Sequence, residues 1–328
     1  MPRKRAILQP FAILVSIGLL AWVVCRLKDP RELSAAFLQA WQSPQWLLMG
    51  ILAFGGALAC GTLRWWILLK ALSIPMKASR TVQLYAVGHF YNIIIPGATG
   101  GDVVKAGCAV LEHPEKRPEA VASILAERVI GFLALAVIVT LVAAFRGDIF
   151  TDHLRWVRWF CFAFGTATFV AFGLLFGVDV GFLFTRRHGG TEDGELGGWR
   201  GLVLRLYEAM RLCSRHPQAL GKVFALSMGN HVCTALCTGF IGMALGAEVR
   251  MLDVVCVSAV VNAVTAISLT PGGAGVREFA TLELLKHIHV TDSIAVTMSL
   301  LTFGVILLWA AIGGVCYMIL RWKTNENV

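Results

Sequence analysis

Charged residues inside apolar segments are the first sign of chemistry in this sequence. Six ionisable residues fall within stretches otherwise suited to a membrane: Asp102, Lys105, Glu127, Arg128, Arg277 and Glu278. Each such charge costs about 2.5–3.5 kcal/mol at the centre of a membrane helix, so it requires an internal partner or a ligand. Three of the six are cationic, which favours an anionic ligand. Ion pairs with a purely structural role are the alternative.

Arg128 is the residue whose position most requires a partner. It lies about nine residues into its helix, too deep for its side chain to reach the membrane surface comfortably. It therefore needs an anionic substrate or an internal carboxylate, such as Asp102 or Glu278. Asp102 has two further options, because it can pair with Lys105 three residues later or cap the helix that it begins. Glu127 precedes Arg128 directly and points about 100° away from it, so the two need separate partners.

Two apolar segments, 81–111 and 253–288, are interrupted near their middle by proline and glycine. The first break reads Pro-Gly-Ala-Thr-Gly-Gly over 96–101, and the second reads Pro-Gly-Gly-Ala-Gly over 271–275. Backbone that is not helical is tolerated at membrane depth only where protein buries it or where it lines a wet cavity. A helix that restarts after each break directs unpaired N–H groups into such a cavity, which favours an anion. The alternative is that the breaks only pack against neighbouring helices.

A stripe of polar residues leads to each break. Tyr85, His89 and Asn92 lie on one helical face of the first segment, and a serine, Asn262 and a threonine repeat that spacing in the second. The stripes, the breaks and the ionisable residues together define a predicted binding site. Its residues are His89, Asn92, Pro96, Gly100, Gly101, Asp102, Lys105, Glu127, Arg128, Asn262, Pro271, Gly272, Gly273, Gly275, Arg277 and Glu278.

The composition of the whole chain requires that a membrane surround these residues. The 328 residues are 57% apolar and 15% charged, with a mean hydropathy of +0.71, whereas soluble proteins are about 45–50% apolar and roughly 25% charged. This excludes a soluble globular protein, a disordered chain and a disulfide scaffold. We expect an all-α, polytopic membrane protein that forms one domain over residues 1–328. The predicted spanning helices are 6–25, 46–67, 119–144, 157–178, 223–245 and 293–320.

The distribution of basic residues predicts the orientation of these helices. With both termini in the cytoplasm, 17 of the 29 Lys and Arg residues face the cytoplasm and 8 face the other side. This count requires that each interrupted segment return to the side from which it entered. We therefore predict two re-entrant hairpins in an inverted arrangement, within pseudo-repeats 81–144 and 253–320. An amphipathic helix over 198–213 is expected to lie on the cytoplasmic leaflet.

The remaining motifs exclude several kinds of site. The nine cysteines include no C-x-x-C pair, and the histidines form no H-E-x-x-H pattern, so we expect no metal and no cofactor. No nucleophile motif predicts a catalytic residue, and no aromatic-interleaved basic stripe predicts nucleic-acid binding. His89 and His231 are interpreted as hydrogen-bonded interior histidines. Arg64, which precedes two tryptophans, is interpreted as an interfacial anchor.

Four short motifs carry a resemblance to a known family. They are Phe90-Tyr-Asn-Ile-Ile-Ile-Pro96, Gly100-Gly-Asp-Val-Val-Lys105, Ala126-Glu-Arg-Val-Ile-Gly131 and Leu269-Thr-Pro-Gly-Gly-Ala-Gly-Val-Arg-Glu278. Over essentially its whole length the chain resembles the lysylphosphatidylglycerol synthase transmembrane family, whose domain is flippase-like. The resemblance implies a bacterial-type inner membrane and a lipid-handling role. In multi-domain relatives a soluble aminoacyl-transferase domain follows this membrane part; because only eight residues follow the last predicted helix, we expect that domain to be absent here. Lys105 stands where relatives often have arginine.

The leading hypothesis is a translocase or binding protein for a phospholipid or glycolipid, without enzymatic activity of its own. The second hypothesis is a membrane subunit of an enzyme that transfers aminoacyl or sugar groups onto lipid, which requires a lipid-modifying partner enzyme. The third is a scaffold for envelope enzymes. Only the first two assign a role to the polar residues at the two breaks.

Overall fold

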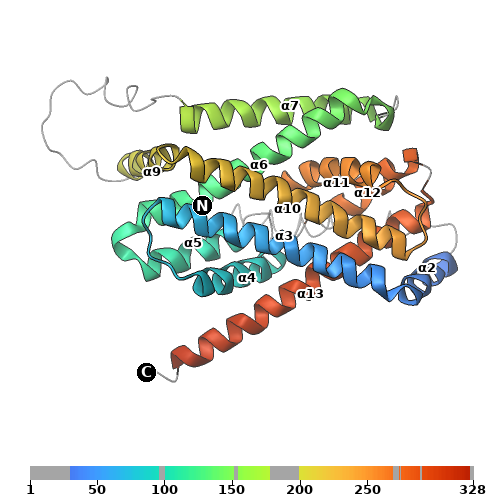
Figure 1. Ribbon diagram of the computed structural model, residues 1–328, viewed down its shortest axis with the longest axis horizontal. Coiled ribbons are helices and arrows are strands. Elements are labelled where there is room, and N and C mark those ends of the chain that lie inside the picture. Colours follow the sequence, from blue (N-terminus) through green and yellow to red (C-terminus); the bar gives the residue numbers. More distant parts are fainter. Residues whose placement is uncertain are drawn as a thin grey trace, which may run out of the picture.

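The computed structural model describes residues 30–95, 100–150, 154–177, 199–268, 273, 275–288 and 290–325 (Figure 1). The described residues form helices and short connections and contain no strand. The α-helices are α2 (Pro30–Gln42), α3 (Pro44–Ala71), α4 (Ala78–Ile94), α5 (Gly100–Glu112), α6 (Arg117–Phe145), α7 (Arg155–Phe172), α9 (Trp199–Ser214), α10 (Pro217–Ala244), α11 (Met251–Ala266), α12 (Val276–Leu285) and α13 (Asp292–Asn325). Single turns of other helix types are η1 (Pro114–Lys116), η2 (Gly147–Ile149), η4 (Gly173–Gly177) and η6 (Lys286–Ile288). The predicted all-α class is confirmed.

Five helical stretches among the described residues are long and apolar enough to cross a membrane. They are Pro44–Ala71, Pro114–Phe145, Arg155–Phe176, Pro217–Ala244 and Asp292–Ile319. Each coincides with one of the predicted spans, with ends displaced by a few residues. The sixth predicted span, 6–25, lies outside the described residues. The chain is therefore a multi-pass membrane protein, as its composition requires.

The first interrupted segment folds into a helical hairpin of α4 and α5. The hairpin is closed at its base by an ion pair between Arg80 Nη2 and Glu112 Oε1, 2.6 Å apart. Near its tip the two backbones touch, since a Cβ atom on Gly101 would overlap the carbonyl group of Gly88. The Asn92 side chain also accepts a hydrogen bond from the Gly101 amide over 2.7 Å. The first hairpin therefore begins and ends at the same end of the molecule, where α3 ends.

The second interrupted segment forms a hairpin of α11 and α12 at the opposite end of the molecule (Figure 1). Its base is tied to the end of α6 by Arg146, whose Nη1 lies 2.8 Å from Asp253 Oδ1. Arg146 also binds Asp148, and this ion pair lowers the pKa of the Asp148 carboxyl. The two hairpins thus open toward opposite ends. That each dips into the membrane and returns to its own side stays a prediction, as do the pseudo-repeats.

Two apolar cores fill the two ends of the molecule, with a polar layer between them. One core includes Trp65 of α3, Ile130 of α6 and Val223 of α10. The other includes Phe54 of α3 and Cys237 of α10. On these long helices the change from one core to the other occurs within a few turns. The polar side chains of the predicted site lie at or beside this boundary.

Helix α9 corresponds to the predicted amphipathic helix over 198–213. Its described side chains include Ala209, Met210 and Cys213, which are buried in the core shared with α3, α6 and α10. The helix is therefore present, and the described part of its predicted apolar face, Met210 and Cys213, is buried against neighbouring helices. Its position on the cytoplasmic leaflet stays a prediction.

The close approach of α4 and α5 predicts that alanine substitutions at two glycines of α5 change the stability of the protein very differently. Gly101→Ala forces the two backbones apart and is expected to destabilise the protein by about 1–3 kcal/mol or more. Gly107→Ala is the control, because a Cβ atom there meets nothing within 4 Å and alanine favours a helix by about 1 kcal/mol. Thermal unfolding in detergent measures both, and equal stability of the two variants would contradict the close approach.

Candidate functional site

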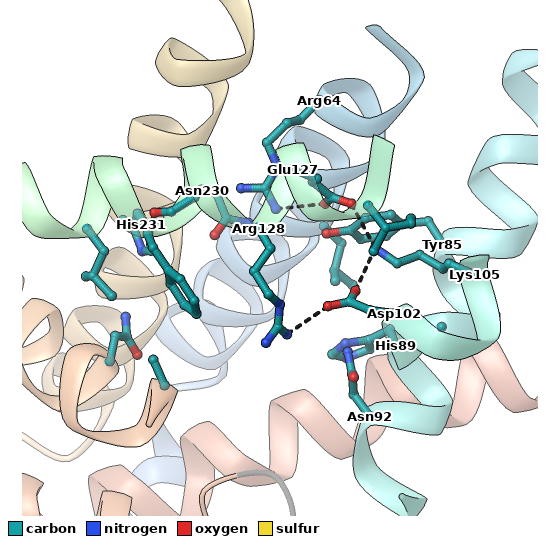
Figure 2. Close-up of a pocket in the computed structure, with 18 residues that line it drawn as sticks. Arg64, Tyr85, His89, Asn92, Asp102, Lys105, Glu127, Arg128, Asn230 and His231 are labelled. Atoms are coloured by element: carbon teal, nitrogen blue, oxygen red, sulfur yellow. Dashed lines mark hydrogen bonds and ion pairs between the residues drawn. The ribbon is translucent and has the colours of Figure 1, made fainter. Parts of the chain in front are cut away.

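A cavity of about 260 Å³ lies between α3, α4, α5, α6, α10 and α11 (Figure 2). Each of the six helices contributes side chains to the lining of the cavity. Seven residues of the predicted site line this cavity: His89, Asn92, Asp102, Lys105, Glu127, Arg128 and Asn262. Residues far apart in the sequence, from both interrupted segments, thus meet at one place.

Five charged side chains in the cavity form a continuous series of ion pairs, which we call the ion chain and which dashed lines mark in Figure 2. In order, its members are Arg64, Glu127, Lys105, Asp102 and Arg128. Arg64 Nη2 lies 2.8 Å from Glu127 Oε1, and Glu127 Oε2 lies 2.9 Å from Lys105 Nζ. Lys105 Nζ lies 3.0 Å from Asp102 Oδ1. Asp102 Oδ2 in turn lies 2.8 Å from Arg128 Nη2. Each carboxylate therefore bridges two cations, and a cation stands at each end.

The ion chain runs from a buried interior to an accessible end. The side chains of Glu127 and Lys105 are 4% and 5% exposed, whereas that of Arg128 is 26% exposed. Arg128 also lies over the ring of Phe132, 5.6 Å from its centroid. Its guanidinium extends into the middle of the cavity (Figure 2). Of the five charged groups, Arg128 is thus the one best placed to meet a ligand.

The ion chain carries an excess of one positive charge. Three cations, Arg64, Lys105 and Arg128, face two carboxylates, Asp102 and Glu127. No other Asp, Glu, Lys or Arg is among the described residues that line the cavity. An unbalanced charge in a low-dielectric interior is costly and strongly favours an ion of opposite sign.

The uncharged polar residues around the ion chain are held by the neighbouring helices. His231 Nε2 lies 3.2 Å from the Gly131 carbonyl oxygen, and His89 Nε2 lies 3.4 Å from that of Ile306. Asn230 Nδ2 donates to the Ala57 carbonyl oxygen over 2.7 Å. The interpretation of both histidines as hydrogen-bonded interior residues agrees with these contacts. They position the rings at the wall of the cavity.

The interpretation of Arg64 as an interfacial anchor is wrong. Its guanidinium is buried, donates to Glu127 and to Ser227, and lines the cavity. The reason is the length of α3, which continues to Ala71 and places Arg64 about 10 Å from the helix end. Tyr85, Asn230 and His231 also line the cavity but were not in the predicted site. The signals that could have found them are the adjacent polar residues Asn230 and His231 in a long apolar segment, and the place of Tyr85 on the polar stripe of the first interrupted segment.

Two predicted site residues on α12 do not reach the ion chain. Arg277 pairs with its neighbour Glu278, with Nη2 and Oε1 2.8 Å apart, and lines a separate cavity of about 190 Å³. Asn262 lines both cavities. The single predicted binding site is therefore divided: Arg128 and Lys105 line one cavity and Arg277 lines the other.

The helix N-termini after the breaks are already capped in part. The Gly101 amide donates to Asn92, and the Gly275 amide donates to Glu278 Oε2 over 2.6 Å. Gly100, Gly273 and Gly275 are buried. Pro96, Pro271 and Gly272 of the predicted site lie outside the described residues. The cationic side chains, rather than the helix N-termini, are thus the main anion-attracting groups.

The chain matches the model of a known protein family. The model of the lysylphosphatidylglycerol synthase transmembrane region matches residues 10–314, nearly the whole chain. The chain belongs to this family. Its resemblance to the family, stated from four motifs, is confirmed, and those motifs include four of the five members of the ion chain.

Two curated relatives of this family member are archaeal membrane proteins. A UPF0104 membrane protein of Methanothermobacter thermautotrophicus is 25% identical over 312 residues, which cover 87% of each chain. A UPF0104 membrane protein of Pyrococcus horikoshii is 22% identical over 276 residues, covering 78% of this chain and 81% of that one. Their descriptions give a membrane location and no substrate.

The described residues contain no group of three or more His, Cys, Asp or Glu side chains arranged to hold a metal ion.

Glu127 is predicted to be the member of the ion chain on which folding depends most. Glu127→Gln leaves Arg64 and Lys105 without their shared carboxylate, which is expected to cost about 3–5 kcal/mol of stability. Adding Lys105→Met is expected to recover part of the loss, because it removes one uncompensated cation. Glu112→Gln is the control: its ion pair with Arg80 is more exposed and contributes about 1 kcal/mol or less.

Equilibrium unfolding of the detergent-solubilised protein measures these differences. A Glu127→Gln variant as stable as Glu112→Gln would show that the ion chain does not stabilise the fold.

Proposed function

We propose that this protein binds the phosphate group of a membrane lipid in the ion-chain cavity and moves that lipid between leaflets. The observation that carries the proposal is the single excess positive charge among the described residues of the cavity. A phosphodiester carries one negative charge. Its entry neutralises the site, and that match favours a phospholipid or phosphate-linked glycolipid over a neutral lipid.

Arg128 is the residue proposed to contact the phosphate. A guanidinium presents several donors in a planar fork that suits phosphate oxygens, and Arg128 extends from α6 into the cavity. Asp102 holds it from one side and the ring of Phe132 lies beside it. Lys105 and Arg64 lie deeper and supply positive potential without leaving their carboxylate partners.

The size of the cavity suits a headgroup rather than a whole lipid. Its volume of about 260 Å³ is near the lower end of the roughly 300–1,000 Å³ typical of small-molecule sites. The acyl chains are proposed to remain in the surrounding bilayer, against the apolar faces of the long helices. The chain itself is proposed to lie in a cell inner membrane with both termini in the cytoplasm.

Movement of the lipid is proposed to use the two hairpins. They open toward opposite ends of the molecule and both contribute to the cavity wall, through Asn92 and Asn262. Rocking of one hairpin relative to the long helices exposes the cavity first to one side of the membrane and then to the other. Transporters built from inverted repeats use the same alternating access.

A lipid-scrambling assay in reconstituted vesicles tests the proposal. Arg128→Gln is expected to slow the exchange of a fluorescent phospholipid by about tenfold or more, because a hydrogen bond to a charged group contributes about 1.5–3 kcal/mol. Arg117→Gln, an exposed substitution on the same helix and outside the cavity, is the matched control and is expected to retain the wild-type rate. Equal scrambling by Arg128→Gln and wild-type protein would refute the proposed role.

A further inference from the structure

The second cavity, of about 190 Å³, has a different chemical character from the first. It lies between α10, α11, α12 and α13, and most of its polar lining consists of serine and threonine hydroxyl groups. Arg277 is its one charged lining residue among those described, and Arg277 is neutralised by Glu278. Unlike the ion-chain cavity, this cavity therefore carries no excess charge.

Most of these hydroxyl groups already donate a hydrogen bond within the protein. Thr234, Thr265 and Thr302 each donate to the carbonyl oxygen four residues earlier in their own helix, over 2.7–2.9 Å. Ser299 donates to Glu278 Oε1 over 3.2 Å. A hydroxyl that donates in this way still has lone pairs, so it accepts a hydrogen bond from a ligand. The wall is thus rich in acceptors.

Two further hydroxyls supply donors. Ser258 on α11 and Thr281 on α12 line the cavity and are 8% and 5% exposed. Neither hydroxyl forms a hydrogen bond with any part of the chain that the structure describes. The two residues are mostly buried and line the cavity, so their hydroxyl groups are open to a ligand there. A ligand that both donates and accepts hydrogen bonds satisfies the hydroxyl groups of this wall.

The second cavity adjoins the ion-chain cavity. Asn262 lines both, and His89 of the first cavity contacts the carbonyl oxygen of Ile306, which lines the second. A volume of about 190 Å³ corresponds to roughly six water molecules, enough for a small ring or short polyol and too small for an acyl chain with its headgroup. A group in this cavity is therefore close to a phosphate bound at Arg128.

We propose that the second cavity is a subsite for a hydroxyl-rich group, a polyol or a sugar, that is joined to the lipid phosphate. This inference rests on the proposed function, which it deepens by naming the class of headgroup. Ligand hydroxyls donate to the threonine oxygens and accept from Ser258 and Thr281. A quaternary ammonium headgroup has no donor for these oxygens, so the cavity discriminates against it.

Titration calorimetry with short-chain lipids in detergent tests the subsite. The probes are dioctanoyl phosphatidylinositol and dioctanoyl phosphatidylglycerol, compared with dioctanoyl phosphatidylmethanol, which has the same charge and no headgroup hydroxyl. At least one polyol lipid is expected to bind the wild-type protein about tenfold more tightly than phosphatidylmethanol. The double substitution Ser258→Ala/Thr281→Val is expected to reduce that preference about 3- to 10-fold, since each neutral hydrogen bond contributes modestly to the binding free energy.

Two control variants separate the possible failures. Thr297→Val removes a buried threonine hydroxyl on α13 outside the cavity and is expected to leave the preference unchanged. Arg128→Gln is expected to weaken all three lipids alike. Equal binding of the three lipids to the wild-type protein, or an unchanged preference in the double variant, overturns the subsite alone. Failure of the wild-type protein to bind any of the three overturns the proposed function as well.

Discussion

The chain of five alternating charges between α3, α5 and α6 is the interaction on which the rest of the site depends. Two carboxylates hold three cations within 3.0 Å in the interior of a membrane protein. Removing either carboxylate leaves buried cations without compensation, so the helices that carry them are fixed relative to one another. The same chain leaves one positive charge in excess. The predicted contribution to stability and the proposed ligand preference therefore involve the same five side chains.

The two hairpins make this arrangement possible. A break in a membrane helix places polar residues near the middle of the molecule without requiring a complete span to be polar. The first hairpin is tight because Gly88 and Gly101 let its helices touch, and this brings Asp102 and Lys105 beside Glu127 and Arg128. The second hairpin comes from the other end and supplies the hydroxyl-lined cavity. Asp102 and Lys105 of the charged cavity thus come from the first hairpin, whereas Ser258, Thr265 and Thr281 of the hydroxyl-lined cavity come from the second.

The sequence predicts the helices well because lipid imposes one rule on all of them. Five predicted spans match five observed helices, since a spanning segment is defined by its length and apolarity alone. Pairings are harder to predict. The partnership of Arg128 with Asp102 was one of two options, and the role of Arg64 depended on the unpredicted length of α3. Arg277 was expected in the same site as Arg128. Adjacent residues of a helix point about 100° apart, so the sequence does not predict that Arg277 pairs with its neighbour Glu278.

Native mass spectrometry of the protein, extracted in a mild detergent from cell membranes, tests the central claim most directly. We expect the wild-type protein to retain a lipid with a phosphate group, and we expect neutral lipids not to be enriched over their membrane abundance. The retained lipid is expected to be depleted by about tenfold in a variant in which the accessible end of the ion chain is neutralised. Retention of neutral lipids only, or the same retained phospholipid in that variant, would contradict the account.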